Sequence, residues 1–132
     1  MPAWCLDVTI GRVATKVLIV DDHAGFRTQA RSLLATAGYE VVGEAEDGRS
    51  ALVAISKLRP DLVLLDVQLP DMTGFDIAGL LRQDPDAPVV ILVSSREASD
   101  YGGRIVRSGA QGFVSKGELS ANTLARIIER PS

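Results

Sequence analysis

The chain has 132 residues, of which 46% are hydrophobic, and its formal net charge is −3. This length suits one domain, and the apolar content suffices for a packed core without disulfide or metal staples. The acidic balance argues against nucleic acid as a direct partner, because phosphate backbones attract basic surfaces.

Residues 1–15 have mixed polarity and no clear period, so we expect a poorly ordered extension there and a folded domain over 16–130. The single cysteine, Cys5, excludes an intrachain disulfide and fits a reducing compartment. The first residues lack the basic and apolar regions of a signal peptide, and no apolar run is long enough to span a membrane. We therefore expect a cytoplasmic location and no membrane partner.

From Lys16 onward, short apolar runs alternate five times with stretches of helical periodicity. The first expected strand, 17–20, precedes a helix that ends near Gly38, a residue type common at helix C-termini. The second strand, 39–45, precedes a helix that Pro60 terminates. The apolar faces of these two helices comprise Phe26, Ala30, Leu33, Leu34 and Ala37, and Ala51, Leu52, Ile55 and Leu58, respectively.

The second half of the chain continues the alternation. The third strand, 62–65, ends at Asp66 and precedes a helix through Phe75, Ala78 and Leu81. The fourth strand is expected at 89–93 and the fifth at 110–115. Between them lies a weaker helix over roughly 98–108, interrupted by Gly102-Gly103, and a last helix runs near 119–129.

Alternating strands and helices with short links predict an α/β fold with a parallel sheet and right-handed crossovers. Strands buried on both faces are near-continuous apolar runs, and the first, third and fourth strands fit this description. We expect a doubly wound, flavodoxin-like five-stranded sheet with the order 2-1-3-4-5.

Polar or charged side chains follow four of the five expected strands. They are Asp21 and Asp22, Asp66, Ser94, and Lys116. Binding sites of such sheets form beyond the carboxyl ends of the strands, so these side chains should meet at one edge. Three close carboxylates favour a divalent cation such as Mg²⁺, and a lysine and a hydroxyl can bind phosphate oxygens. The set predicts a phosphoryl-transfer site in which a carboxylate could be the nucleophile.

Each of these residues also has an ordinary structural explanation. An acidic pair can cap a helix, an aspartate can begin a turn, and a lone serine or lysine is usually a surface residue. The only histidine, His23, is expected at the exposed start of a helix rather than as a ligand or base. The joint placement at four strand ends therefore carries the functional interpretation.

With these motifs, the sequence over about residues 16–130 resembles the receiver domain of bacterial two-component response regulators. The segments that carry the resemblance are Val-Leu-Ile-Val-Asp-Asp, Asp-Leu-Val-Leu-Leu-Asp-Val-Gln-Leu-Pro-Asp-Met-Thr-Gly, the Ser after the fourth strand and the Lys after the fifth. The spacings from Asp22 to Asp66 and from Ser94 to Lys116 are those usual for the family. Ser94-Ser95, and Gly117 where many receivers have proline, resemble the branch with LuxR/NarL-type regulators.

The resemblance implies a role for each matching residue. Asp66 would be the phosphoacceptor, with Ser94 and Lys116 contacting the phosphoryl group. Mg²⁺ or Mn²⁺ would be bound by Asp21, Asp22, Asp66 and the backbone carbonyl of Gln68. Ser94 and the aromatic Phe113 would form the switch, although Ser95 is a nearby rival for the hydroxyl position.

The resemblance further implies a signalling domain rather than an enzyme, with self-phosphorylation and self-dephosphorylation as its only chemistry. The phosphoryl donor would be a sensor histidine kinase or a phosphotransfer protein. Phosphorylation would switch the face formed by the fourth helix, fifth strand and fifth helix and so control an output or partner. Homodimerisation on this face is a further option that no sequence feature decides.

Three other classes of protein share part of this pattern. A phosphatase of the haloacid dehalogenase type would need a second aspartate at Gln68, and a flavodoxin-like cofactor binder would need a Ser, Thr or Gly-rich loop in place of Asp21-Asp22. Both are set aside. The alternative that stays open is a degenerate receiver that binds proteins without being phosphorylated.

Overall fold

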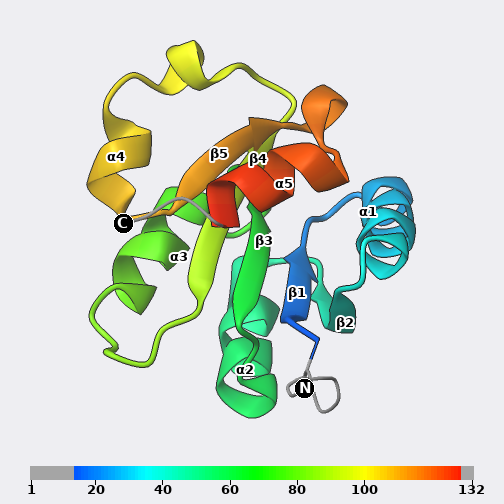
Figure 1. Ribbon diagram of the computed structural model, residues 1–132. Helices are drawn as coiled ribbons and strands as arrows, with labels where there is room; N and C mark the ends of the chain where they lie inside the picture. The colour runs from blue at the N-terminus through cyan, green and yellow to red at the C-terminus, as the bar shows by residue number, and fades with distance from the viewer. Residues whose placement is uncertain (1–13, 129–132) are drawn as a thin grey trace, which may run out of the picture.

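The computed structural model describes residues 14–128, and five parallel strands form its centre (Figure 1). The strands are β1 (Lys16–Val20), β2 (Glu40–Ala45), β3 (Leu62–Asp66), β4 (Val89–Ser94) and β5 (Gly112–Ser115). Their order in the sheet is β2-β1-β3-β4-β5, as predicted. The expected extension at 1–15 falls largely outside the described residues, as does the end of the domain at 129–130.

Helices connect successive strands across both faces of the sheet. They are α1 (Ala24–Thr36), α2 (Gly48–Leu58), α3 (Gly74–Leu81), α4 (Arg104–Ser108) and α5 (Ala121–Ile128), with short 3₁₀ turns η1 (Ala98–Tyr101) and η2 (Lys116–Glu118). Within residues 14–128, no helix is long and apolar enough to cross a membrane.

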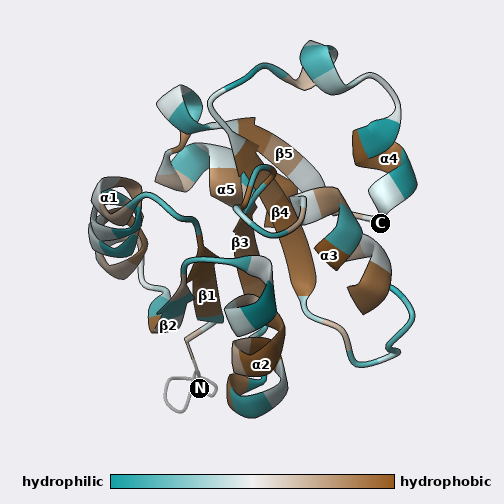
Figure 2. Ribbon diagram, turned by 180° about the vertical axis from the view of Figure 1, so that it is seen from behind, coloured by the Kyte–Doolittle hydropathy of each residue, from teal (hydrophilic) through white to brown (hydrophobic). Residues whose placement is uncertain are grey.

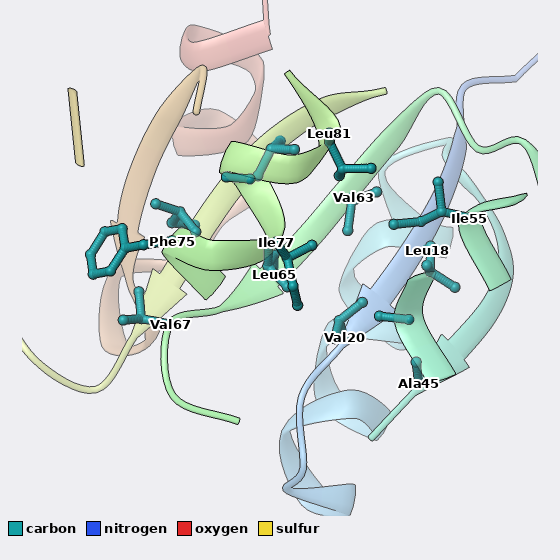
Figure 3. Close-up of a cluster of buried hydrophobic side chains, with 14 residues drawn as sticks. Leu18, Val20, Ala45, Ile55, Val63, Leu65, Val67, Phe75, Ile77 and Leu81 are labelled. Carbon is teal, nitrogen blue, oxygen red and sulfur yellow. The ribbon is translucent and has the colours of Figure 1, made fainter. Parts of the chain in front are cut away.

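The core has two halves because side chains alternate between the faces of each strand. On one face, strand residues such as Leu18, Leu65 and Leu92 pack against α2 and α3, as Figure 3 shows for Leu18 and Leu65. On the other face, Ile19 and Leu64 pack against α1 and α5. Strands β1, β3 and β4 are therefore mostly apolar, whereas β2 at the edge of the sheet also carries polar residues and the helices alternate in polarity (Figure 2). Each fully buried aliphatic side chain stabilises the fold by about 2 kcal/mol.

The weak fourth helix is divided as its glycines predict. A 3₁₀ turn ends at Tyr101, Gly102 adopts a φ of 57°, and only five residues of α-helix follow. Because Gly has no Cβ, it enters this conformation without steric strain. The segment between β4 and β5 is therefore two short pieces rather than one continuous helix.

The expected bounds near the C-terminal end need correction. The fifth strand was expected from residue 110 but begins at Gly112, since Gly109 ends α4 with a φ of 84° and the chain must first reach the sheet. The last helix was expected from residue 119 but begins at Ala121, because the Ser120 hydroxyl accepts a hydrogen bond from the Thr123 backbone N–H and caps it.

Candidate functional site at the carboxyl edge of the sheet

The polar residues at the strand ends meet at one edge of the sheet. Asp66 and Ser94 are the last residues of β3 and β4, and Lys116 follows β5 directly. A cleft of about 510 Å³ opens there. It is lined by Asp22, His23, Phe26, Asp66, Gln68, Leu69, Pro70, Ser94, Ser95 and Lys116.

Asp21 lies beneath this cleft and is fully buried. Its Oδ1 accepts a hydrogen bond from the His23 backbone N–H at 2.8 Å. Its Oδ2 makes no regular hydrogen bond among the described residues, but the Lys116 ammonium lies 2.6 Å away. The same ammonium lies 3.6 Å from Asp66 Oδ2. Lys116 therefore compensates two buried carboxylates at once.

The protonation of Asp66 is altered by its surroundings. Asp66 is 6% exposed, and burial together with the negative charge of Asp21 raises its pKa to about 6. Lys116 and the backbone N–H of Gln68 act in the opposite direction. Burial dominates because the charged form loses its hydration while the nearby cation is shared with Asp21.

Lys116 also contacts the ring of Phe26, a residue that the sequence predicted only as part of the apolar face of the first helix. Its Nζ lies 4.6 Å from the centroid of the Phe26 ring, a cation–π contact. Phe26 comes from α1 and lines the cleft. Helical periodicity marks such a residue as apolar-facing, but it does not show that the ring ends beneath a lysine.

Backbone contacts fix the loop that carries Gln68. The Gly74 N–H donates to the Val67 carbonyl at 2.7 Å, and the Thr73 hydroxyl caps α3. A Cβ on Gly74 would lie 2.5 Å from the backbone oxygen of Asp66, so the loop closes this tightly only with glycine. Asp71 accepts hydrogen bonds from the first backbone N–H groups of α2 and ties the loop to that helix.

The acidic residues after β1 suit a hard cation. Ligand atoms of Asp21, Asp22 and His23 all lie within 4.8 Å of one another. Asp66 is not part of that group, but it faces the same lysine as Asp21. A set dominated by carboxylate oxygens is the type that Mg²⁺ prefers. His23 is exposed and lies directly before α1 in the N-cap position, as expected for a helix-start residue.

The two candidate hydroxyls differ in their surroundings. Ser94 is 3% exposed, and its Oγ accepts a hydrogen bond from the Arg96 backbone N–H at 3.0 Å. Ser95 lines the cleft but is exposed. The Ser94 Oγ also lies 2.6 Å from the hydroxyl of Tyr101, a residue that the sequence analysis missed. The sequence offered one indication of this contact, a tyrosine with its hydroxyl seven residues after Ser94.

Phe113, the expected aromatic switch residue, lies outside the residues that line the cleft. It is half-buried on β5, and its ring centroid lies 5.8 Å from that of Tyr101. Phe113 is therefore connected to Ser94 through the Tyr101 side chain rather than by facing the cleft itself.

Comparison with known proteins identifies the family of this chain. Residues 17–129 match the family description of the response regulator receiver domain. The response regulator GacA of Pseudomonas aeruginosa is 40% identical over 77% of this chain and 48% of its own length. The DNA-binding transcriptional activator EvgA of Escherichia coli is 34% identical over 83% of this chain and 54% of its own. The chain thus spans about half the length of these curated relatives.

A relative and a solved structure that the chain covers almost completely agree as well. The chemotaxis protein CheY of Thermotoga maritima is 36% identical over 76% of this chain and 84% of its own length. The structure of the chemotaxis response regulator CheY4 of Vibrio cholerae superposes with a TM-score of 0.76 at 31% identity and covers 89% of this chain and 98% of that one. The family match, the relatives and the fold agree: the chain belongs to the response regulator receiver domains of two-component systems.

Proposed function

We propose that Asp66 accepts a phosphoryl group in a two-component phosphorelay. The observation that carries this proposal is the Lys116 ammonium between Asp21 and Asp66, beside a cleft that Ser94 also lines. A shared cation keeps a buried carboxylate available as a nucleophile and remains near it to bind a phosphoryl oxygen.

The reaction forms one bond and breaks another. An Oδ atom of Asp66 bonds to the phosphorus of a phosphohistidine, the bond from phosphorus to the histidine nitrogen breaks, and the imidazole leaves with its electron pair. Asp66 becomes an acyl phosphate. The Ser94 hydroxyl donates a hydrogen bond to the group, and Lys116 contributes its positive charge.

Mg²⁺ or Mn²⁺ would be held by Asp21, Asp22, Asp66 and the Gln68 carbonyl. When bound, the cation offsets the carboxylate charges and stabilises the charge on the phosphoryl oxygens. The carboxylates near Asp21 and the fixed loop around Gln68 support this assignment.

A receiver implies a sensor histidine kinase or phosphotransfer protein as donor. The face of α4, β5 and α5 would change with the phosphorylation state of Asp66 and so control an output, a partner or a homodimer. The domain would act in the cytoplasm, without direct contact to nucleic acid or membrane. The division of the α4 region into short pieces supports this choice of face, since little packing must be broken to move it.

Radiolabelled acetyl phosphate tests the proposal. The wild type should incorporate phosphate in the presence of Mg²⁺ and not in EDTA, and Asp66→Asn should abolish incorporation. Asp86→Asn removes an exposed carboxylate in the loop before β4, at the end of that strand opposite Ser94, and should leave labelling unchanged. Labelling of the Asp66 variant would contradict the site, and an unlabelled wild type would favour the degenerate receiver.

A further inference from the structure

We propose that Tyr101 is the positioning residue of the switch: its hydroxyl holds the Ser94 hydroxyl in the unphosphorylated protein and releases it when a phosphoryl group reaches Asp66. This inference rests on the proposed function of Asp66. The aromatic residue that contacts the Ser94 hydroxyl thus lies between β4 and α4, whereas the resemblance to the family implied Phe113 on β5 as the partner of Ser94 in the switch.

The two hydroxyls form a direct contact inside the protein. The oxygens of Ser94 and Tyr101 lie 2.6 Å apart, a short distance even for a hydrogen bond between hydroxyls. Ser94 also accepts the Arg96 backbone N–H. Within residues 14–128, no hydrogen bond joins Ser94 to Asp66, so the serine is engaged with Tyr101 and the loop.

The hydrogen-bonding capacity of a serine limits what can follow. A hydroxyl has one donor hydrogen and two acceptor lone pairs. Phosphoryl oxygens only accept, so Ser94 must direct its single hydrogen to them. That bond is charge-assisted and stronger than one between neutral hydroxyls. In the proposed resting state Ser94 is the donor in its contact with Tyr101, while its oxygen accepts the Arg96 N–H. Giving that one hydrogen to a phosphoryl oxygen therefore ends the hydrogen bond to Tyr101.

The surroundings of Tyr101 connect this event to a larger segment. Its ring lies between Phe75 on α3, at 5.3 Å between centroids, and Phe113 on β5, at 5.8 Å. Tyr101 ends η1, and Gly102-Gly103 separate it from α4. Loss of the hydroxyl contact leaves the ring held by packing, next to two glycines whose backbone is less restricted than that of other residues.

Phe113 cannot take over this role, because its ring has no hydroxyl. Both aromatic residues pack against the same core half, yet only Tyr101 reaches Ser94. Tyr101→Phe therefore removes the proposed contact and keeps the ring between its neighbours. The chain has one other tyrosine, Tyr39, which packs against the opposite core half, and Tyr39→Phe is the matched control.

Beryllofluoride with Mg²⁺ is the probe, because it adds a phosphoryl-like group to an aspartate. Its affinity should rise roughly two- to tenfold in Tyr101→Phe, since one hydrogen bond of the resting state is lost. Tyr39→Phe should bind as the wild type does. An unchanged or weaker affinity of Tyr101→Phe would overturn the role of Tyr101.

A spectroscopic readout separates positioning from general stability. With tyrosine labelled at ¹³Cζ, the protein gives two resonances, and Tyr39→Phe identifies that of Tyr101. This resonance should move when beryllofluoride saturates the protein, and Ser94→Ala should move it without any ligand. A fixed Tyr101 resonance with bound beryllofluoride, seen by ¹⁹F NMR, would refute this proposal alone. Absence of any bound beryllofluoride would instead refute the proposed function and the release step with it.

Discussion

The Lys116 ammonium lies closer to Asp21 than to Asp66, at 2.6 Å against 3.6 Å. Asp21 is fully buried, so its carboxylate depends on this lysine for compensation. Lys116 therefore has a structural role in the unphosphorylated protein, in addition to the phosphate contact proposed for it.

Lys116→Met should destabilise the metal-free protein by about 3 kcal/mol, because it leaves a buried carboxylate without its cation. Mg²⁺ should restore part of the loss by supplying positive charge. Urea unfolding in EDTA and in Mg²⁺ measures both effects. Lys57→Met, on the exposed side of α2, is the control and should change little. Equal stability of the two variants in EDTA would show that Asp21 does not need Lys116.

Asp66→Asn should make the metal-free protein more stable near neutral pH. The folded state holds the Asp66 proton more tightly than the unfolded state, since the pKa rises from 3.8 to about 6. The wild type therefore loses stability as pH rises through this window, by about 3 kcal/mol, and stays less stable above it.

Urea unfolding in EDTA as a function of pH measures this effect. The wild type and Asp66→Asn should be similar below pH 3.8, diverge as pH rises to about 6, and keep a constant difference above that pH. Asp86→Asn should follow the wild type throughout. A wild type at least as stable as Asp66→Asn near pH 7 would contradict the raised pKa of Asp66.

Gly74→Ala should destabilise the protein by about 1–3 kcal/mol, because its Cβ would clash with the Asp66 backbone oxygen. Labelling by acetyl phosphate should also slow, since the β3–α3 loop must move. Gly79 lies in the same helix with nothing within 4 Å of an added Cβ. Gly79→Ala should therefore stabilise by up to about 1 kcal/mol. Thermal unfolding compares the two, and the opposite ranking would argue against the tight loop.

Phe26→Leu should weaken the hold on Lys116. A double-mutant cycle with Lys116→Met should give a coupling free energy of about 0.5–1 kcal/mol, the usual range of a cation–π contact. The same cycle with Lys57→Met should give none. If Phe26 and Lys116 prove additive, the ring serves only as packing.

The strand order and the edge where the polar residues meet could be predicted from the sequence. Apolar runs define the strands, and parallel topology brings their carboxyl ends to one side, so Asp66, Ser94 and Lys116 had to be neighbours. Which carboxylate lies closest to Lys116 could not be predicted. Whether Lys116 sits nearer Asp21 or Asp66 depends on about an ångström of side-chain placement, which no sequence period encodes.

Tyr101 illustrates a second limit. It falls in a stretch where two glycines weaken the helical pattern, so its direction could not be inferred from periodicity. The short turn η2 was missed for a related reason, since three residues are too few to show a period. The sequence therefore could not predict the positions of side chains in irregular segments, and these include Tyr101 of the proposed switch.

The brevity of α4 has an energetic consequence. Ser108 is its only buried residue, and Val106 is 83% exposed. A helix with so little burial opens locally at a small fraction of the global unfolding free energy. Amide hydrogens of α4 should therefore exchange long before those of β3 or β4. This region can sample alternative conformations while the sheet that carries Asp66 stays intact.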